Sequence, residues 1–97
     1  MRKIEIITNV CNKTNLPKQD TIITIETFLK EIESCLQTGK NIYIRGFGTF
    51  MLKKRAKKTG RNILQNKSVE IPEHYIPFFK PSKKFKQIVA KQKENSI

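Results

Sequence analysis

The sequence is poor in the residues that usually build metal centres, disulfide frameworks and acid–base pairs. Among 97 residues it has one histidine and two cysteines. Cys11 and Cys35 form no CxxC or zinc-type cluster, so small buried thiols are favoured over a disulfide or a metal site. His74 stands alone near a proline turn, where a structural or exposed role is the simpler interpretation. We therefore expect no catalytic residue, no bound metal and no cofactor.

Long apolar runs are also missing. No stretch approaches the length that spans a bilayer. The opening residues, MRKIEIITNV, begin with positive charge, but Glu5 and Asn9 interrupt any signal-peptide core. We expect a cytoplasmic protein with no membrane partner and no small-molecule substrate.

Acidic residues are scarce in the second half of the chain. Residues 1–52 carry seven lysine or arginine residues against five acidic ones, whereas residues 53–97 carry thirteen against three. A merely solubilising surface would intersperse the two signs, as the first half does. A block of one sign indicates an anionic partner, and nucleic acid is favoured over an acidic membrane. Most carboxylates fall on polar helix faces, where i, i+4 pairing explains them, so a metal-dependent nuclease is disfavoured.

The first forty residues predict two helices. Apolar residues recur at helical spacing over 3–14, and Pro17 can open a second helix over about 18–38. Gly39 is a natural stop for that helix. The resulting helical hairpin has one apolar face. On the second helix this face is formed by Ile22, Ile25, Leu29, Ile32 and Leu36.

From about residue 41 the apolar period changes to two, which predicts β-strands. The segment NIYIRGFGTFML alternates on both sides of a glycine-rich turn at 46–48, whose Phe47 is expected to point inward. The returning segment IPFFK is expected to bring Phe78 and Phe79 back to the core.

The polar segment TGRNILQNK lies between two further strands. The strand after the turn is expected to continue through 53–58, and KSVEIP at 67–72 forms its return. Apart from Ile63 and Leu64, the connecting segment has no apolar residue that could hold it on the body. We therefore expect a long β-hairpin arm at about 53–74.

The chain is expected to be one domain that dimerises. Without the arm, roughly seventy-five residues remain, which is marginal for an independent core. An obligate dimer would cover the surplus apolar side chains, and a core role is favoured over an RNA-stacking platform for the phenylalanines. The parts are a helical dimerisation part (1–40), a sheet with its arm (41–80), a C-terminal helix (81–91) and a frayed tail (92–97). The predicted dimer core comprises Ile25, Leu29, Ile32, Leu36, Ile42, Ile44, Phe47, Phe50 and Phe79.

Several motifs resemble the bacterial HU and integration host factor family of DNA-binding proteins. RGFGTF, KKTGRN and IPFFKPSKKFK, together with the helical hairpin, match in register from about residue 1 to 90. The resemblance implies an α+β fold, with an N-terminal helical hairpin, a three-stranded antiparallel sheet with a long protruding β-arm, and a short C-terminal helix. It also implies an intertwined dimer, formed with an identical chain or with a paralogue.

The same resemblance implies an architectural, nucleoid-associated function. Such a protein binds double-stranded DNA in the minor groove with little sequence specificity, prefers bent, nicked or flexible sites, and bends and compacts the DNA. Sequence-preferring binding in the manner of integration host factor is the alternative, and RNA binding is a more distant one.

The arm tip departs from the Arg-Asn-Pro that is usual in the family, where proline is wedged between base pairs. Ile63 occupies the proline position, and a branch of the family is similar in carrying RNI followed by IPEH. Isoleucine can insert between base steps from the minor groove, so we expect Ile63 to be the DNA wedge. Leu64 is equally well interpreted as a second wedge or as a residue that stabilises the tip.

The remaining expected contacts are mostly basic side chains that neutralise phosphates. Lys53, Arg55, Lys57 and Arg61 share one strand parity, which predicts that one face of the arm meets DNA. The expected DNA-binding residues are Lys3, Arg45, Gly46, Lys53, Arg55, Lys57, Lys58, Arg61, Asn62, Ile63, Lys67, Lys80, Lys83, Lys84 and Lys86.

Overall fold

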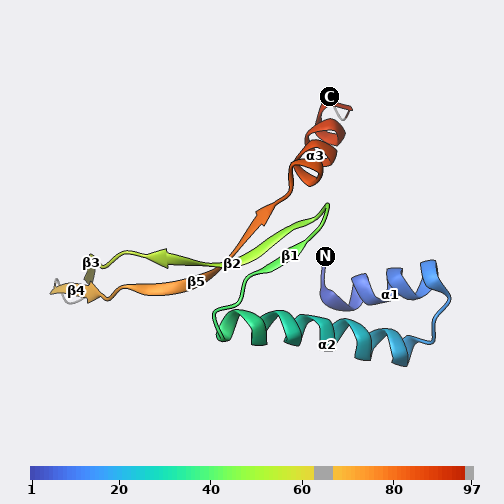
Figure 1. The fold of residues 1–97 in the computed structure, drawn as a ribbon, viewed down its shortest axis with the longest axis horizontal. Helices are drawn as coiled ribbons and strands as arrows, with labels where there is room; N and C mark the ends of the chain where they lie inside the picture. Colours follow the sequence, from blue (N-terminus) through green and yellow to red (C-terminus); the bar gives the residue numbers. More distant parts are fainter. Residues whose placement is uncertain (63–66, 96–97) are drawn as a thin grey trace.

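The structure, a computed structural model, describes residues 1–62 and 67–95. Two helices lead into a sheet with a projecting arm, and a third helix follows the last strand (Figure 1). The elements are α1 (Lys3–Thr14), α2 (Lys18–Gln37), β1 (Ile42–Ile44), β2 (Gly48–Arg55), β3 (Lys58–Asn62), β4 (Lys67–Ile71), β5 (His74–Pro81) and α3 (Lys83–Asn95).

α1 and α2 form the predicted helical hairpin, with bounds within one residue of those expected. α1 ends at Asn15, whose φ of 60° is left-handed and whose N–H donates to the carbonyl of Cys11 at 2.8 Å. α2 ends in a Schellman motif, because the N–H of Gly39 donates to Leu36 and the N–H of Lys40 donates to Cys35. Gly39 accommodates this turn at a φ of 82°. The chain is thereby directed from α2 into β1.

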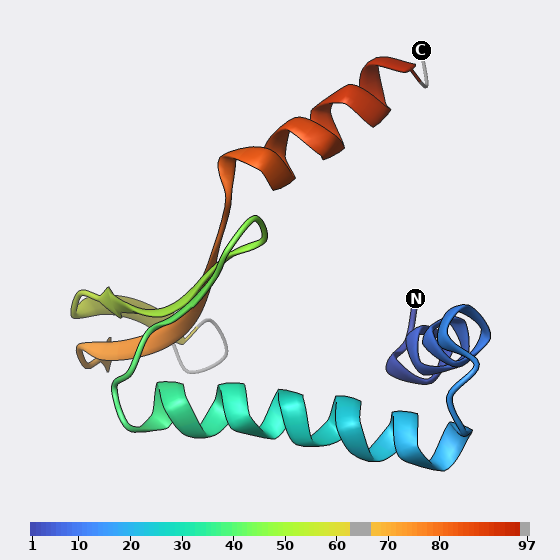
Figure 2. The ribbon, with the colours of Figure 1, turned by 45° about the vertical axis from the view of Figure 1, so that its right-hand side comes forward.

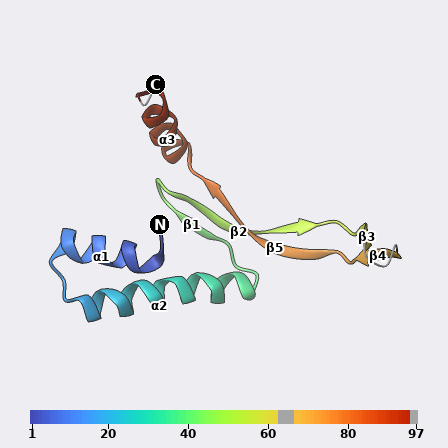
Figure 3. The ribbon, with the colours of Figure 1, turned by 180° about the vertical axis from the view of Figure 1, so that it is seen from behind.

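One hairpin register runs through both the sheet and the arm. β2 is the central strand, with β1 on one side and β5 on the other. β2 pairs antiparallel with β5, with Gly48 opposite Pro81. β3 and β4 keep this register, with Lys58 opposite Ile71, so neither strand carries an inserted residue. The long hairpin projects away from α1, past the end of α2 (Figure 3).

The arm is interrupted where the sequence predicted a continuous strand over 53–58. Residues 56–57 and the opposing residues 72–73 lie outside the strands. Pro72 has no N–H to give to the ladder, which explains a break at this step. Figure 1 shows β3 and β4 turned out of the direction of β2 and β5 beyond the break. The arm therefore consists of two paired segments joined by a bend.

Strand alternation gives the sheet an apolar face. Phe50 and Phe79 are opposite each other in the β2–β5 ladder, with ring centroids 4.8 Å apart. Phe47 lies 5.1 Å from both the Phe79 and Phe85 rings. A Cβ at Gly48 would lie 2.6 Å from the Phe79 ring, so only glycine permits this packing. The inward direction predicted for Phe47 is confirmed, although its side chain is 42% exposed in the single chain.

The prediction that Phe78 returns to the core with Phe79 is wrong. Consecutive residues of a strand point to opposite faces, so only one of the two can join the phenylalanine cluster. Phe78 is 38% exposed, and the Nζ atom of Lys53 lies 4.7 Å from its ring centroid.

Two smaller expectations also need correction. The thiols of Cys11 and Cys35 were expected to be buried, but both residues are only half-buried. α3 was expected to end near residue 91 with a frayed tail, yet the helix extends to Asn95.

A single chain encloses very little apolar surface. Among the described residues, only Ile7 and Leu36 are buried apolar side chains. The accessible area is 8708 Å², whereas a compact chain of this mass exposes about 5,700 Å². The radius of gyration is 19.0 Å, against about 12.5 Å for a compact domain of this length. Figure 2 shows α3 and the helical hairpin extending from the sheet without covering one another.

Candidate nucleic-acid interface

The sheet face opposite the phenylalanine cluster carries positive charge. On β2, Lys53 and Arg55 lie on this face, and Lys80 of β5 joins them by register. Neither β2 nor β5 contains an acidic residue. We call this surface, formed by the side chains of Met51, Lys53, Arg55, His74, Ile76, Phe78 and Lys80, the basic face.

Lysines from three elements converge on one hollow of the basic face. Lys53, Lys80 and Lys86 line a hollow of about 520 Å³ together with Phe78. The Lys53 ammonium lies over the Phe78 ring, a cation–π contact that holds the charge on this face. Such a concave, cationic and partly apolar surface suits the backbone and edge of a nucleic acid.

The start of α3 is fixed against the β1–β2 turn. The Ser82 hydroxyl oxygen accepts a hydrogen bond from the N–H of Phe85 at 3.1 Å, as expected of an N-cap. The N–H of Ser82 donates to the carbonyl of Phe47 at 2.9 Å. A Cβ at Gly46 would lie 4.0 Å from the Lys84 side chain, so this turn and the basic first turn of α3 are adjacent. Lys83 is the first residue of α3, and Arg45 is the first residue of the turn between β1 and β2.

Among the residues that the structure describes, three lysines are paired with carboxylates of the same chain. The pairs are Lys3 with Glu26, Lys54 with Glu73, and Lys57 with Glu70. All six side chains are about half exposed or more, so each pair contributes little and is screened by salt. Lys57 lies between β2 and β3 rather than within a strand. Strand alternation therefore does not place Lys57 on the same face of the arm as Arg61, as the sequence had predicted.

His74 lies on the basic face, directly opposite Arg55 in the ladder. Its Nδ1 atom is 3.0 Å from the carbonyl oxygen of Pro72. Sequence reasoning did not include it among the DNA contacts. Counting back from Lys80 in steps of two would have placed His74 on the same face.

The expected DNA wedge lies outside the described residues, as does Leu64. The backbone of the arm is described up to Asn62 and again from Lys67, whereas the side chains near the tip are not. Ile63 is therefore placed only by its position in the sequence.

The described residues form neither a metal cluster nor a membrane-spanning helix. No three His, Cys, Asp or Glu side chains within 1–62 and 67–95 gather in a way that could hold a metal ion. No helix in these ranges combines the length and apolar character needed to cross a membrane.

The helical hairpin, the armed sheet and the basic face together define a DNA-binding protein of a recognised bacterial type. The family model described as "Bacterial DNA-binding protein" matches residues 1–90. The chain belongs to this family, which confirms the resemblance drawn from the motifs.

Relatives of two named kinds match along almost the whole chain. A DNA-binding protein HU from Clostridium pasteurianum is 35% identical over 91 residues, covering 94% of this chain and 100% of the relative. An integration host factor subunit beta from Pseudomonas fluorescens is 36% identical over 98 residues, covering 100% of both.

Solved structures show the same fold. An Anabaena HU–DNA cocrystal structure matches with a TM-score of 0.88 and 30% identity, covering 93% of this chain and 98% of the other. HU from Thermotoga maritima matches with a TM-score of 0.65 and 28% identity, covering 92% and 98%. The predicted α+β fold is confirmed by this likeness.

Proposed function

We propose that this protein is an architectural, histone-like DNA-binding protein that acts as a dimer. It binds double-stranded DNA in the minor groove with little sequence specificity, and bends and compacts it. The observation that carries this proposal is the basic face. Lysine and arginine side chains from β2, β5 and α3 gather there without a carboxylate, while the opposite face is apolar.

The dimer is supported by the apolar surface that one chain leaves uncovered. Of the predicted core residues only Leu36 is buried, whereas Leu29 and Phe47 are each 42% exposed. Phe28, on the same helix as Leu29, is 54% exposed. The accessible area of one chain exceeds that of a compact chain of the same mass by about 3,000 Å². An obligate interface buries roughly 2,000–5,000 Å². A second copy of the chain is the simplest partner that would bury these apolar side chains. Residues 1–97 act as one domain of that dimer.

The arms provide the bending. Each arm carries part of the basic face outward and ends near Ile63, the expected wedge. Insertion of an apolar side chain costs a few kcal/mol of base unstacking, which is offset when the bent duplex reaches more of the basic face. Sites that are already flexible or nicked reduce this cost, which accounts for the proposed preference for them.

The proposed function is structural rather than catalytic. The family is one of DNA-binding proteins, and the carboxylates Glu70 and Glu73 beside the basic face are paired with lysines. We place the protein in the cytoplasm on the nucleoid, where its DNA would be.

Sequence-preferring binding is the alternative function. The observation that favours it is the match to integration host factor subunit beta over 100% of both chains. A related paralogue would then be the partner in a heterodimer.

Salt titrations with several duplexes test the proposal. If a dimer makes roughly 6–10 phosphate contacts, affinity should fall by about 10³–10⁵ between 50 and 200 mM salt, nearly equally for unrelated sequences. Shortened ring-closure times of small fragments should report bending. A shallow salt slope with strong preference for one sequence would favour the alternative. Failure to bind any duplex would refute both.

A further inference from the structure

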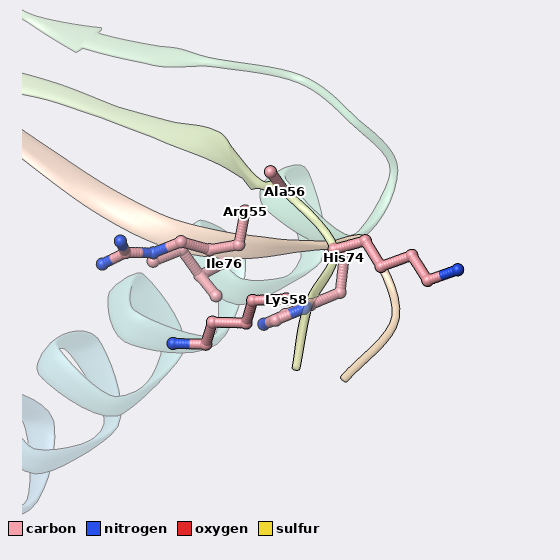
Figure 4. A pocket seen from close by; sticks show the side chains of 6 residues that line it. Arg55, Ala56, Lys58, His74 and Ile76 are labelled. Atoms are coloured by element: carbon pink, nitrogen blue, oxygen red, sulfur yellow. The ribbon is translucent and has the colours of Figure 1, made fainter. Parts of the chain in front are cut away.

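A second basic hollow lies at the bend of the arm. It measures about 550 Å³, and its lining includes Arg55, Lys58 and His74 (Figure 4). None of the lining residues is acidic. The hollow therefore has the charge of an anion site within the proposed DNA surface.

The bend creates this hollow. In a straight ribbon, Lys58 would lie on the face opposite Arg55, because the two positions differ by an odd number of residues. The break at 56–57 changes this, and both side chains line the same hollow as His74. Figure 4 shows the Lys58 side chain and the His74 imidazole extending to the same side of the arm.

The histidine ring contacts the backbone of the bend. Its Nδ1 lies 3.0 Å from the Pro72 carbonyl oxygen, which can only accept a hydrogen bond, so Nδ1 carries the hydrogen. In the neutral ring, Nε2 then keeps a free lone pair. A second proton at Nε2 turns the ring into a cation that can donate to an anion.

We infer that His74 is a proton-dependent ligand for a DNA phosphate at the bend of each arm. The inference rests on the proposed function and adds pH control to it. The imidazolium would bind the phosphate through a charge-assisted hydrogen bond beside the cations of Arg55 and Lys58. A negative phosphate in the hollow in turn favours the protonated ring, so DNA binding draws a proton onto each arm.

Other charged groups near the bend do not supply the same effect. These groups are Arg55, Lys57, Lys58, Glu70 and Glu73. The two carboxylates already have partners, since Glu70 pairs with Lys57 and Glu73 pairs with Lys54. Imidazole is the side chain among them whose charge ordinarily changes between pH 5 and 8.

Duplex binding by the full-length dimer, followed from pH 8 to pH 6, tests the inference. The affinity of the parent protein should rise by about tenfold per arm, and calorimetry in buffers of different ionisation enthalpy should show net proton uptake. The salt slope should become steeper by about 1.8, because two further phosphate contacts form per dimer. The chain has one histidine, so its imidazole resonances report His74 directly.

Two substitutions separate charge from structure. H74Q stays neutral and should bind with a flat pH profile, whereas H74K stays charged and should bind tightly at both ends of the range. Both replace the imidazole with a flexible side chain that can donate hydrogen bonds, and they differ chiefly in charge. K13Q, at the end of α1, removes a cation elsewhere and should keep the parent pH profile.

The outcomes distinguish the inference from the proposed function. DNA binding with the same proton uptake in the parent and H74Q would refute the role of His74 and leave the proposed function standing. Loss of duplex binding by the parent at every pH would refute both.

Discussion

Adjacent lysines on β2 offer a sharp test of the basic face. Lys53 and Lys54 have the same charge, are both exposed and lie one residue apart in the strand. Lys53 belongs to the basic face, over Phe78, whereas Lys54 points to the other face and pairs with Glu73 at 3.0 Å. The proposed DNA surface therefore requires one of them and not the other.

The expected difference between K53Q and K54Q follows from counterion release. K53Q removes one phosphate contact per arm and two per dimer, so the logarithmic salt slope should become shallower by about 1.8. At 0.1 M salt this corresponds to an affinity loss of about 60-fold. K54Q should change the slope by less than about 0.5, since it removes no phosphate contact.

Fluorescence anisotropy with a labelled duplex over a salt series measures both slopes. Thermal melts serve as the control, because exposed substitutions of this kind usually change stability by less than about 0.5 kcal/mol. Equal losses for K53Q and K54Q would show that net charge alone controls affinity. The assignment of the basic face would then be wrong.

Three further predictions concern the dimer, the phenylalanine cluster and the arm tip. Sedimentation should find no folded monomer, and the melting temperature should rise with protein concentration, because one chain leaves Phe28 and Phe47 largely uncovered. G48A should lower the free energy of unfolding by about 1–3 kcal/mol or more in urea, since the new Cβ would lie 2.6 Å from both the Phe79 ring and a backbone carbonyl. In G39A the new Cβ would meet no neighbouring atom. This variant should therefore lower the free energy of unfolding only by the strain of a left-handed alanine, about 1–2 kcal/mol. I63A should keep the salt slope and lose the DNA bend in ring-closure assays.

The helices could be predicted because their signals are local. Apolar spacing marks each helix, Pro17 precedes the second, and Gly39 satisfies the backbone geometry at its end. These features act within a few residues, so no knowledge of the remaining chain is needed. The glycine-rich turn before β2 was predictable for the same reason.

The bend in the arm could not be predicted because it depends on strand register. Residues 56–57 include no proline or glycine that would mark a break, and the interruption is explained only once Pro72 is known to lie opposite them. The same register places His74 beside Arg55, and the break at 56–57 brings Lys58 into the hollow with them. Phe78 was misplaced although alternation with Phe79 was visible in the sequence, since one of two adjacent aromatics must face away from the core.

The Ile63→Ala variant separates the wedge from the phosphate contacts. The substitution leaves every lysine and arginine in place, so the number of phosphates neutralised, and with it the salt slope, should remain the same. The two faces of the sheet are also unaffected, so the dimer should melt as the parent does. What the variant lacks is most of the apolar side chain expected to separate a base step, an event that costs a few kcal/mol of stacking. Preference for nicked or mismatched duplexes should therefore weaken together with the bend, because such sites mainly reduce that cost. Energy transfer between the ends of a labelled duplex measures the bend directly. If I63A bends DNA as strongly as the parent, the basic faces alone must wrap the duplex, and Ile63 would serve only the hairpin tip.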